Sequence, residues 1–358
     1  MITIAFYLTS FFDFIFAKNK VLFYFSFFLL LTLFCFNTDN ADYLSYKGSM
    51  ESSVFFSETT RISGYWALLK FFAQNEIDFQ FLYVLIGGVY LITLSLFLKK
   101  FSLNPNIVVG YYMVGIFLLD VVQLKNTLAM TFILWGFYIL FSSNQSLKKK
   151  LIFFGILVLC SSKFHLSGMY FLLFLFLPLS FKTLIKISTL ITVVIFVGGY
   201  FIVDRLVEVG SSQDNFIREY GAGNILATQL TLIAIAVLFA FAFFLFRKKT
   251  YYIQIYKTSM ALLSEKNKGL NEYGLKVVVL SMPLIPLISL NADFRRVFFF
   301  LSIIWVTVVS NWITNKSKFI LSFPIAFIAL FLLNRYVLLG NYEAVFCKIF
   351  QNNMIWGG

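Results

Sequence analysis

The chain has 358 residues, of which 60% are apolar and 13% are charged, and its formal net charge is +13. Soluble globular proteins carry about 25% charged residues, and a soluble fold this apolar would expose larger apolar patches than water tolerates. Composition therefore excludes a soluble enzyme and a disordered chain. The 3 cysteines and 1 histidine exclude a disulfide framework and argue against a zinc site, so we expect neither a metal nor a cofactor.

Apolar runs recur along the whole length and predict an all-α polytopic membrane protein, with 1–358 as a single integral membrane domain. Pro105 suits the start of a helix, and Pro283 with Pro286 predicts a kink inside a span. The run at 151–162 is shorter than a bilayer is thick. We expect about 12 transmembrane helices, at 1–17, 21–36, 79–98, 105–121, 124–142, 151–162, 166–181, 184–203, 225–246, 275–291, 297–313 and 319–337.

The lysines predict which loops face the cytoplasm. With the N-terminus outside, the inner loops collect most of the basic residues, including Lys99, Lys100 and the run Lys148–Lys150. Cytoplasmic loops of membrane proteins carry an excess of Lys and Arg, so both termini are expected on the outer side, and the positive charge needs no nucleic-acid partner. The basic amphipathic segment 247–274 is expected to lie along the inner leaflet, in contact with membrane lipids.

The arginines are distributed differently from the lysines. Six of the seven lie outside or at the outer ends of spans: Arg61, Arg205, Arg218, Arg295, Arg296 and Arg335. Topology alone does not distinguish Arg from Lys, but the guanidinium binds phosphate or carboxylate through two parallel hydrogen bonds. The outer face is therefore expected to hold an anion. Acidic residues gather in the outer loops 37–78 and 204–223, although solvated loops also tolerate acids without any function.

The first outer loop, 37–78, alternates carboxylates, amides and aromatic rings. Asp42, Tyr43 and Tyr46 lie in its first part, and Glu58 and Arg61 follow. Sugar-binding sites use this mixture, because carboxylates and amides bind hydroxyl groups while rings stack on the apolar face of a sugar. An aromatic belt at the membrane interface is the alternative, but a belt does not explain the charged residues.

A tight turn at 119–129 separates two spans at their outer ends. It contains Asp120, Gln123, Lys125 and Asn126 almost without a loop, which predicts polar groups near membrane depth. Ionisable groups there are energetically expensive and usually mark function. The alternative is a short hydrated turn in which Asp120 and Lys125 pair locally.

The single histidine, His165, lies between two apolar runs and two residues after Lys163. An apolar border and a neighbouring cation both favour a neutral imidazole, which can act as a base or as a hydrogen-bond donor. The alternative is a structural histidine whose hydrogen bonds are satisfied internally.

Arg295 and Arg296 are adjacent at the outer start of a span. Anchoring to lipid headgroups is one explanation for them. However, adjacent residues on a helix point about 100° apart, so we expect one of the two to face a cavity rather than lipid.

In order and spacing these residues resemble the EpsG family, a branch of the Wzy-like polysaccharide polymerases. The resemblance covers the first half of the chain best. At the position of Lys125 the family has Arg, so this chain keeps the positive charge there but lacks the two parallel hydrogen bonds that a guanidinium can donate. The matching positions are Asp42, Tyr43 and Tyr46, then Glu58, Gly64 and Tyr65, then Gln123, Leu124, Lys125, Asn126, Leu128 and Ala129, then His165 and Ser167.

The resemblance implies a membrane glycosyltransferase of GT-C-like fold in the bacterial cytoplasmic (inner) membrane. It would polymerise polysaccharide for O-antigen, capsule or exopolysaccharide by joining oligosaccharide repeat units carried on polyprenyl (undecaprenyl) pyrophosphate. A chain-length regulator and a flippase are the protein partners it suggests. An O-antigen-type ligase or a single-sugar GT-C transferase is the alternative, and a flippase or transporter ranks lower because charges in the middle of spans are nearly absent.

The same resemblance suggests roles for the candidate residues. An acceptor hydroxyl needs a base, and arginines would stabilise a pyrophosphate leaving group in place of a metal. The catalytic candidates are His165, Asp42 and Glu58. The substrate-binding candidates are Arg61, Lys125, Arg295 and Arg296 for pyrophosphate and Gln123, Asn126, Tyr43 and Tyr46 for sugar.

Overall fold

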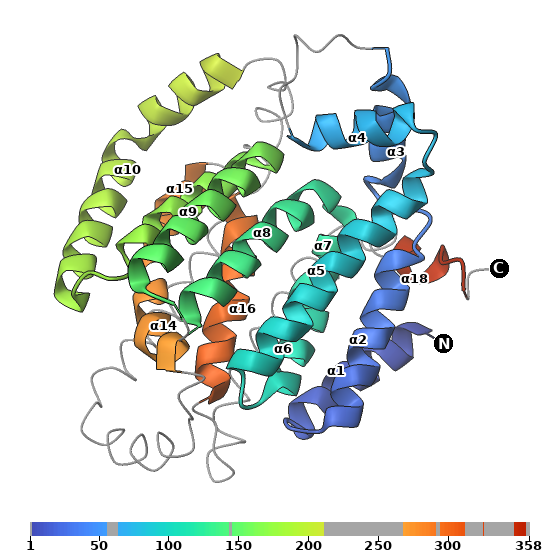
Figure 1. Ribbon diagram of the computed structural model, residues 1–358, viewed down its shortest axis with the longest axis horizontal. Coiled ribbons are helices and arrows are strands. Elements are labelled where there is room, and N and C mark those ends of the chain that lie inside the picture. The colour runs from blue at the N-terminus through green and yellow to red at the C-terminus, as the bar shows by residue number, and fades with distance from the viewer. Residues whose placement is uncertain are drawn as a thin grey trace. The chain divides into compact units, whose positions relative to one another are not determined.

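A computed structural model describes residues 2–55, 64–142, 145–210, 268–290, 294–311, 325 and 347–355 (Figure 1). In these ranges the regular elements are helical, and the β pairing is one isolated bridge between Asn37 and Asn353. The elements are α1 (Ile2–Ile15), α2 (Lys20–Cys35), α3 (Tyr43–Ser52), α4 (Gly64–Gln74), α5 (Phe79–Phe101), α6 (Pro105–Tyr112), the π-helical turn η1 (Met113–Phe117), α7 (Leu118–Val122), α8 (Leu124–Phe141), α9 (Leu147–Phe164), the 3₁₀ helix η2 (Leu166–Phe176), α10 (Phe181–Gly210), α14 (Lys268–Leu280), α15 (Leu284–Leu290), α16 (Phe294–Asn311) and α18 (Lys348–Gln351).

The all-helical class is confirmed, and the described part of the chain contains five helical stretches long and apolar enough to cross a membrane. They are Phe79–Phe101, Pro105–Val122, Leu124–Phe141, Phe181–Gly198 and Phe294–Asn311, while α1, α2 and η2 are apolar but shorter. The expected span 225–246 and all but one residue of 319–337 lie outside the described residues. The total of about 12 spans and the outer position of both termini therefore stay predictions.

Three boundaries show how the sequence pattern translates into helices. Pro105 occupies the first turn of α6, as predicted. The break near Pro283 is also confirmed, because α14 ends at Leu280 and α15 begins only at Leu284. The short run at 151–162 belongs to an 18-residue helix, α9, because the preceding lysines form its first turn.

The expected span at 166–181 is wrong as an α-helix. Residues Leu166–Phe176 form a 3₁₀ helix instead, and a 3₁₀ helix rises about 2.0 Å per residue, so 11 residues cover about 22 Å. The segment 37–78, predicted as an outer loop, also differs from a plain loop, because it contains α3 and α4. In α4 the buried residues Tyr65, Leu69 and Phe72 repeat at helical spacing, so one face of the helix packs inward.

The chain divides into two compact units, which are described separately below. Unit 1 comprises Met1–Leu140, Gln145–Met169 and Val306–Gly358, and unit 2 comprises Phe141–Asn144 and Tyr170–Trp305. Both are built from residues far apart in the sequence, and the single membrane domain 1–358 stays a prediction.

In unit 1 one end is basic and is called the lysine end, defined by Lys18, Lys20, Lys99 and Lys100. Lys99 Nζ lies 4.4 Å from the centre of the Tyr24 ring at the start of α2, and Lys100 Nζ lies 4.2 Å from the Tyr138 ring near the end of α8. Asn106 at the start of α6 donates to the carbonyls of Phe16 and Asn19. The two contacts between lysines and aromatic rings let the long lysine side chains run along apolar helices while each ammonium group stays near a polar boundary.

The opposite end of unit 1, called the Asp42 end, begins with the loop that leads into α3. The ring of Tyr43 lies 5.1 Å from that of Phe79, the first residue of α5. Lys100 lies near the other end of that 23-residue helix, so the two ends of unit 1 are separated by roughly 34 Å at 1.5 Å per residue. That distance is sufficient to cross the apolar core of a bilayer.

Unit 2 is held together by hydrogen bonds from polar side chains to backbone carbonyls. Ser188 Oγ on α10 donates to the Val279 carbonyl (2.6 Å), Tyr170 Oη to that of Leu280 (2.8 Å), and Lys276 Nζ to that of Leu177 (2.9 Å). The predicted amphipathic segment 247–274 is described only from residue 268, where α14 begins, and the predicted loop 204–223 only to residue 210, where α10 ends.

Candidate functional site

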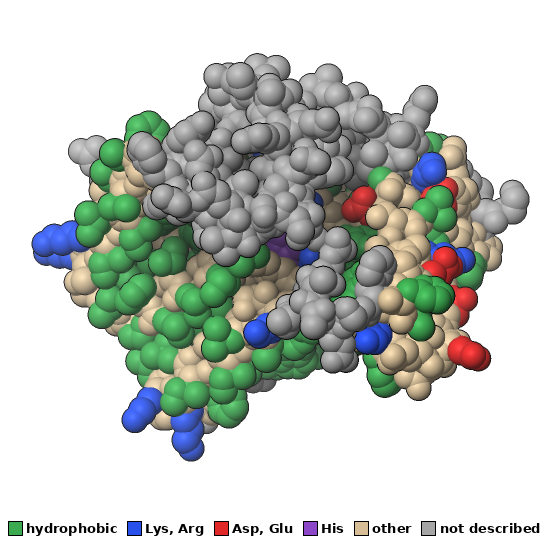
Figure 2. Space-filling model, turned by 90° about the horizontal axis from the view of Figure 1, so that it is seen from above, with side chains coloured by type: hydrophobic (Ala, Val, Ile, Leu, Met, Phe, Trp, Pro, Cys, Tyr) green, Lys and Arg blue, Asp and Glu red, His purple; other side chains and the backbone are tan. Residues whose placement is uncertain are grey.

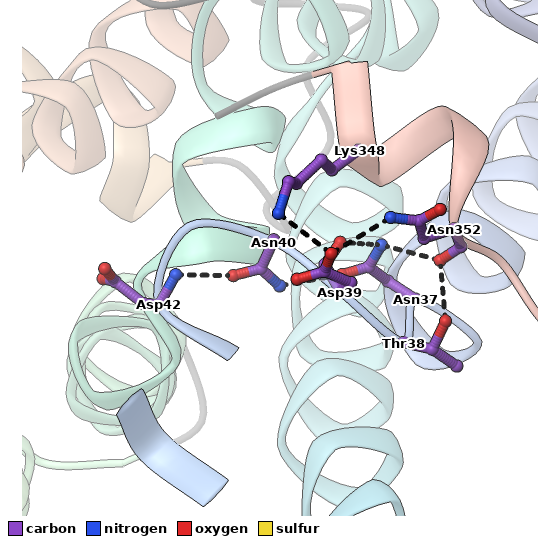
Figure 3. A network of polar contacts seen from close by, with 7 residues as sticks. All are labelled: Asn37, Thr38, Asp39, Asn40, Asp42, Lys348 and Asn352. Carbon is purple, nitrogen blue, oxygen red and sulfur yellow. Dashed lines mark hydrogen bonds and ion pairs between the residues drawn. The ribbon is translucent and has the colours of Figure 1, made fainter. Parts of the chain in front are cut away.

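The loop before α3 is fastened by the C-terminal segment of the chain (Figure 3). Lys348 Nζ and Asn352 Nδ2 lie 3.0 and 3.1 Å from Asp39 Oδ2, and the Asn352 carbonyl accepts from Asn37 Nδ2 (3.1 Å) and the Thr38 amide (2.9 Å). The sequence analysis missed this network, because Lys348 and Asn352 lie more than 300 positions from their partners and nothing in a single sequence links them.

A second link fixes the same loop to the helix junction at 119–129. Asn40 Nδ2 donates to Tyr83 Oη (2.8 Å), and Tyr83 Oη donates in turn to the Val121 carbonyl. Tyr83 is fully buried on α5. A buried hydroxyl that is satisfied on both sides rigidifies its neighbours, so the loop before α3 and the end of α7 are held in one arrangement.

Asp42 lies at the point where α3 begins, yet its carboxylate does not cap the helix. Its backbone amide donates to Asn40 Oδ1 (3.1 Å), which fixes the backbone on which the side chain stands. The side chain is half-buried, and Figure 3 shows its carboxylate pointing away from Asn40 and from the C-terminal segment. The predicted catalytic carboxylate is therefore anchored through its backbone.

The three tyrosines beside Asp42 have different roles. Tyr43 is buried and its hydroxyl donates to Gln80 Oε1 (2.8 Å), so this candidate sugar-binding residue is engaged inside the fold. Burial, with the negative charges of Asp78 and Asp39, raises the pKa of the Tyr43 phenol. Tyr46 is half-buried on α3 and its ring lies 5.6 Å from that of Tyr65 on α4.

Tyr65 is buried, and within the described part of the chain its hydroxyl has no hydrogen-bond partner. Burial raises the pKa of the Tyr65 phenol well above its ordinary value, with further contributions from Tyr46, Tyr83 and Asp42. The phenol therefore remains neutral. A buried donor without an internal partner is costly, so a polar substrate group would find a hydrogen bond there.

The junction between α7 and α8 contributes the amide and cationic candidates. Gln123 directly follows α7 and is half-buried, and Lys125 is half-buried in the first turn of α8. Asn126 is buried, and its Oδ1 has no hydrogen-bond partner in the described residues. Asp120 is only 7% exposed and accepts from Tyr112 Oη (3.0 Å), so it does not belong to a hydrated turn.

His165 directly follows α9, in an extended backbone conformation, and is half-buried. Its Nδ1 lies 2.7 Å from Ser167 Oγ and accepts from the Ser167 backbone amide at 3.3 Å. The end of α9 lies against α4, because a Cβ added at Gly64 would be 3.3 Å from the Cβ of Lys163. His165 therefore lies at the Asp42 end of unit 1, together with Asp42, Tyr46 and Tyr65.

Figure 2 views the molecule from above Figure 1, and its acidic side chains gather on one part of that face. The single histidine of the chain is visible in purple on the same face. Among the described residues, no group of three His, Cys, Asp or Glu side chains is placed to hold a metal ion. The groups brought together are a carboxylate, phenols, amides, an imidazole and a lysine, which can bind a glycan and move a proton.

Four candidates are not part of this grouping. Glu58 and Arg61 lie outside the described residues. Arg295 and Arg296 belong to unit 2, where both stand half-buried in the first turn of α16. Arg295 Nε is buried and has no hydrogen-bond partner within the described residues, as a guanidinium that receives an anion would.

These features define the class of the protein: a helical membrane protein with a polar, sugar-compatible group of residues at one end of its apolar helices. The family model of the EpsG family matches residues 20–347. The chain therefore belongs to the EpsG family, whose members are Wzy-like polysaccharide polymerase-type membrane proteins. No curated protein and no solved structure matches it. It is a membrane protein of polysaccharide biosynthesis.

Proposed function

We propose that this protein is a polysaccharide polymerase that joins polyprenyl-pyrophosphate-linked oligosaccharide units at the outer face of the bacterial cytoplasmic membrane. The observation that carries the proposal is the grouping of Asp42, Tyr46, Gln123, Asn126 and His165 at one end of unit 1, in a chain that belongs to the EpsG family. A flippase that supplies the units and a chain-length regulator are the partners such an enzyme would need.

The reaction transfers a growing glycan from its lipid carrier to a new unit. An acceptor hydroxyl oxygen forms a bond to the anomeric carbon, and the bond from that carbon to the pyrophosphate oxygen breaks. The electron pair leaves with the polyprenyl pyrophosphate, and the hydroxyl proton passes to a protein base. Positive groups that stabilise the leaving anion and a base that receives the proton are therefore the two requirements of the site.

Asp42 is the proposed base, because its backbone is anchored while its carboxylate is not used to cap α3. Gln123, Asn126 and Tyr46 bind sugar hydroxyls or rings, and Tyr43 positions the α3 start through Gln80. Lys125 is the cation proposed to bind the pyrophosphate at this end of unit 1. Arg61, Arg295 and Arg296 stay separate candidates for anion binding, and Glu58 is the second candidate base.

The first test is mass spectrometry of lipid-linked glycans from a strain that lacks the protein. Accumulation of single repeat units without longer chains is the expected result. Full-length polymer retained on its lipid would instead indicate a ligase, and a truncated repeat unit would indicate a single-sugar transferase. An unchanged glycan profile would remove the polymerase proposal altogether.

The arginine assignment is tested in the same strain with a plasmid-borne Arg295→Ala/Arg296→Ala variant. We expect loss of long polymer, because the leaving anion loses charge stabilisation. The matched control is Lys148→Ala/Lys149→Ala, which removes the same charge from exposed residues in the first turn of α9 and should leave the polymer ladder unchanged. Full-length polymer from the arginine variant would contradict the assignment.

A further inference from the structure

We propose that Ser167 is a positioning residue that fixes the proton of His165 on Nε2, so that His165 donates a hydrogen bond to the departing pyrophosphate and is not the base. This inference rests on the proposed function for its catalytic part. The tautomer itself follows from the geometry around one ring nitrogen and can be measured independently of activity.

The assignment depends on what the Ser167 backbone amide can do. A backbone N–H is only a donor, and this one is directed at His165 Nδ1 from 3.3 Å. Nδ1 must therefore present a lone pair, and in a neutral imidazole the proton is then on Nε2. Ser167 Oγ, at 2.7 Å from the same nitrogen, is in turn assigned as a second donor.

The backbone around His165 keeps this geometry in place. The His165 amide donates to the Ser161 carbonyl (3.0 Å), and the His165 carbonyl accepts from the Gly168 amide (2.9 Å). Gly168 packs so closely that an added Cβ would lie 2.5 Å from Ser161 Oγ and 3.0 Å from the Ser162 nitrogen. Hydrogen bonds and close packing therefore hold the turn that contains His165 and Ser167 in one conformation.

This tautomer has a chemical consequence. A protonated Nε2 has no lone pair with which to accept the acceptor hydroxyl proton, and the lone pair of Nδ1 is taken by Ser167. The proton must go elsewhere, and the carboxylate of Asp42 receives it in the proposed mechanism. His165 Nε2–H then stabilises charge that develops on the pyrophosphate oxygen as the bond to the anomeric carbon breaks.

The tautomer is measured by nitrogen NMR on the full-length protein in detergent after ¹⁵N-histidine labelling. The chain contains 1 histidine, so the spectrum reports His165 alone. At mildly alkaline pH we expect a protonated Nε2 and an unprotonated Nδ1. Ser167→Ala removes the closer donor, the hydroxyl at 2.7 Å, and leaves only the backbone amide at 3.3 Å, so it should increase the Nδ1–H population. Ser167→Thr keeps the hydroxyl and should give the wild-type spectrum. A wild-type ring with its proton on Nδ1 would overturn the proposal.

The donor role is measured by polymer formation. His165→Ala should lose roughly 10²–10³-fold in rate, as when a single transition-state donor is removed. His165→Gln places an amide N–H near the Nε2 position and should recover about tenfold, whereas His165→Asn reaches only the Nδ1 position and should not. Equal loss in the Gln and Ala variants would reject the donor role. If the deletion strain makes normal polymer, only the proposed function fails, and the NMR result stands.

Discussion

At the scale of single residues, Asp42 combines a fixed backbone with a carboxylate that the helix start does not use. Most aspartates at this position bond to the first free amides of the helix, but α3 has no such side-chain bond. Because the Asp42 carboxylate does not cap α3, the start of the helix is less stable than it could be, and such a local loss of stability is typical of functional residues.

Asp42→Asn should therefore reduce polymer formation by roughly 10²–10⁴-fold, the range for loss of a general base, and leave folding intact because the amide has the same shape. Polymer length is read on gels, and folding by the midpoint of thermal unfolding in detergent. Glu51→Gln is the matched control, since Glu51 is an exposed carboxylate on the same helix. Wild-type polymer from the Asn variant would transfer the role to another carboxylate.

Tyr83 offers a second residue-scale test, because its hydroxyl joins Asn40 to the Val121 carbonyl. Tyr83→Phe leaves both partners buried without it and should destabilise the protein by about 1–3 kcal/mol. Tyr24→Phe, at a 57% exposed ring, should change stability by less than about 0.5 kcal/mol. If both variants unfold at the same temperature, the Tyr83 hydroxyl does not stabilise the connection between Asn40 and the Val121 carbonyl.

At the residue scale, the sequence identified the candidate site residues but not the residues that hold them in place. The types and spacing of Asp42, Gln123 and His165 pointed to a polar site, whereas Tyr83 reads in the sequence as one more aromatic residue in an apolar run. The partner of Asp39 lies 309 positions away at Lys348. A single sequence contains no signal for a contact over that separation.

At the scale of elements, hydropathy located the long helices well, because burial in lipid requires a continuous apolar run. It missed α3 and α4, which are short and are stabilised by packing of one face. It also assigned η2 to a regular span, because the composition of Leu166–Phe176 does not distinguish a 3₁₀ helix from an α-helix.

The contact between α2 and α5 gives an element-scale prediction with an unusually close control. A Cβ at Gly87 would lie 2.3 Å from the buried ring of Phe34, whereas a Cβ at Gly88 would meet nothing within 4 Å. Gly87→Ala should destabilise the protein by about 1–3 kcal/mol through overpacking, and Gly88→Ala should be neutral or slightly stabilising. Thermal unfolding in detergent compares the two, and equal effects would mean that the helices separate freely at this point.

The C-terminal segment is an element whose effect reaches the loop before α3. Asn352→Asp would place a carboxylate opposite Asp39, where Asn352 Nδ2 now donates over 3.1 Å. Like charges at that distance repel, so we expect shorter polymer and a lower unfolding temperature. A second change, Asp39→Asn, should restore both, while Asn75→Asp, at an exposed helix end, should have no effect. Failure of the double variant to recover would argue against a direct Asn352–Asp39 contact.

At the scale of the whole molecule, the proposal depends on which end of unit 1 faces outward. Lysines mark one end and the candidate catalytic residues the other, and the excess of cytoplasmic Lys and Arg predicts that the Asp42 end is outside. This orientation also gives the site access to lipid-linked units that have already crossed the membrane. The orientation could be predicted from the sequence because charge asymmetry is a global property that does not depend on contacts.

Cysteine labelling of intact cells tests this orientation directly. In a background without Cys35, Cys160 and Cys347, we expect a membrane-impermeant maleimide to label Glu51→Cys in intact cells, and Lys148→Cys only after permeabilisation, because both positions are exposed but belong to opposite ends of unit 1. Polymer formation by each variant shows that the protein is folded. The reverse labelling pattern would place Asp42 and His165 in the cytoplasm, where the donor would be a unit that has not yet been flipped, and polymerisation at the outer face would be excluded even if the residue assignments were correct.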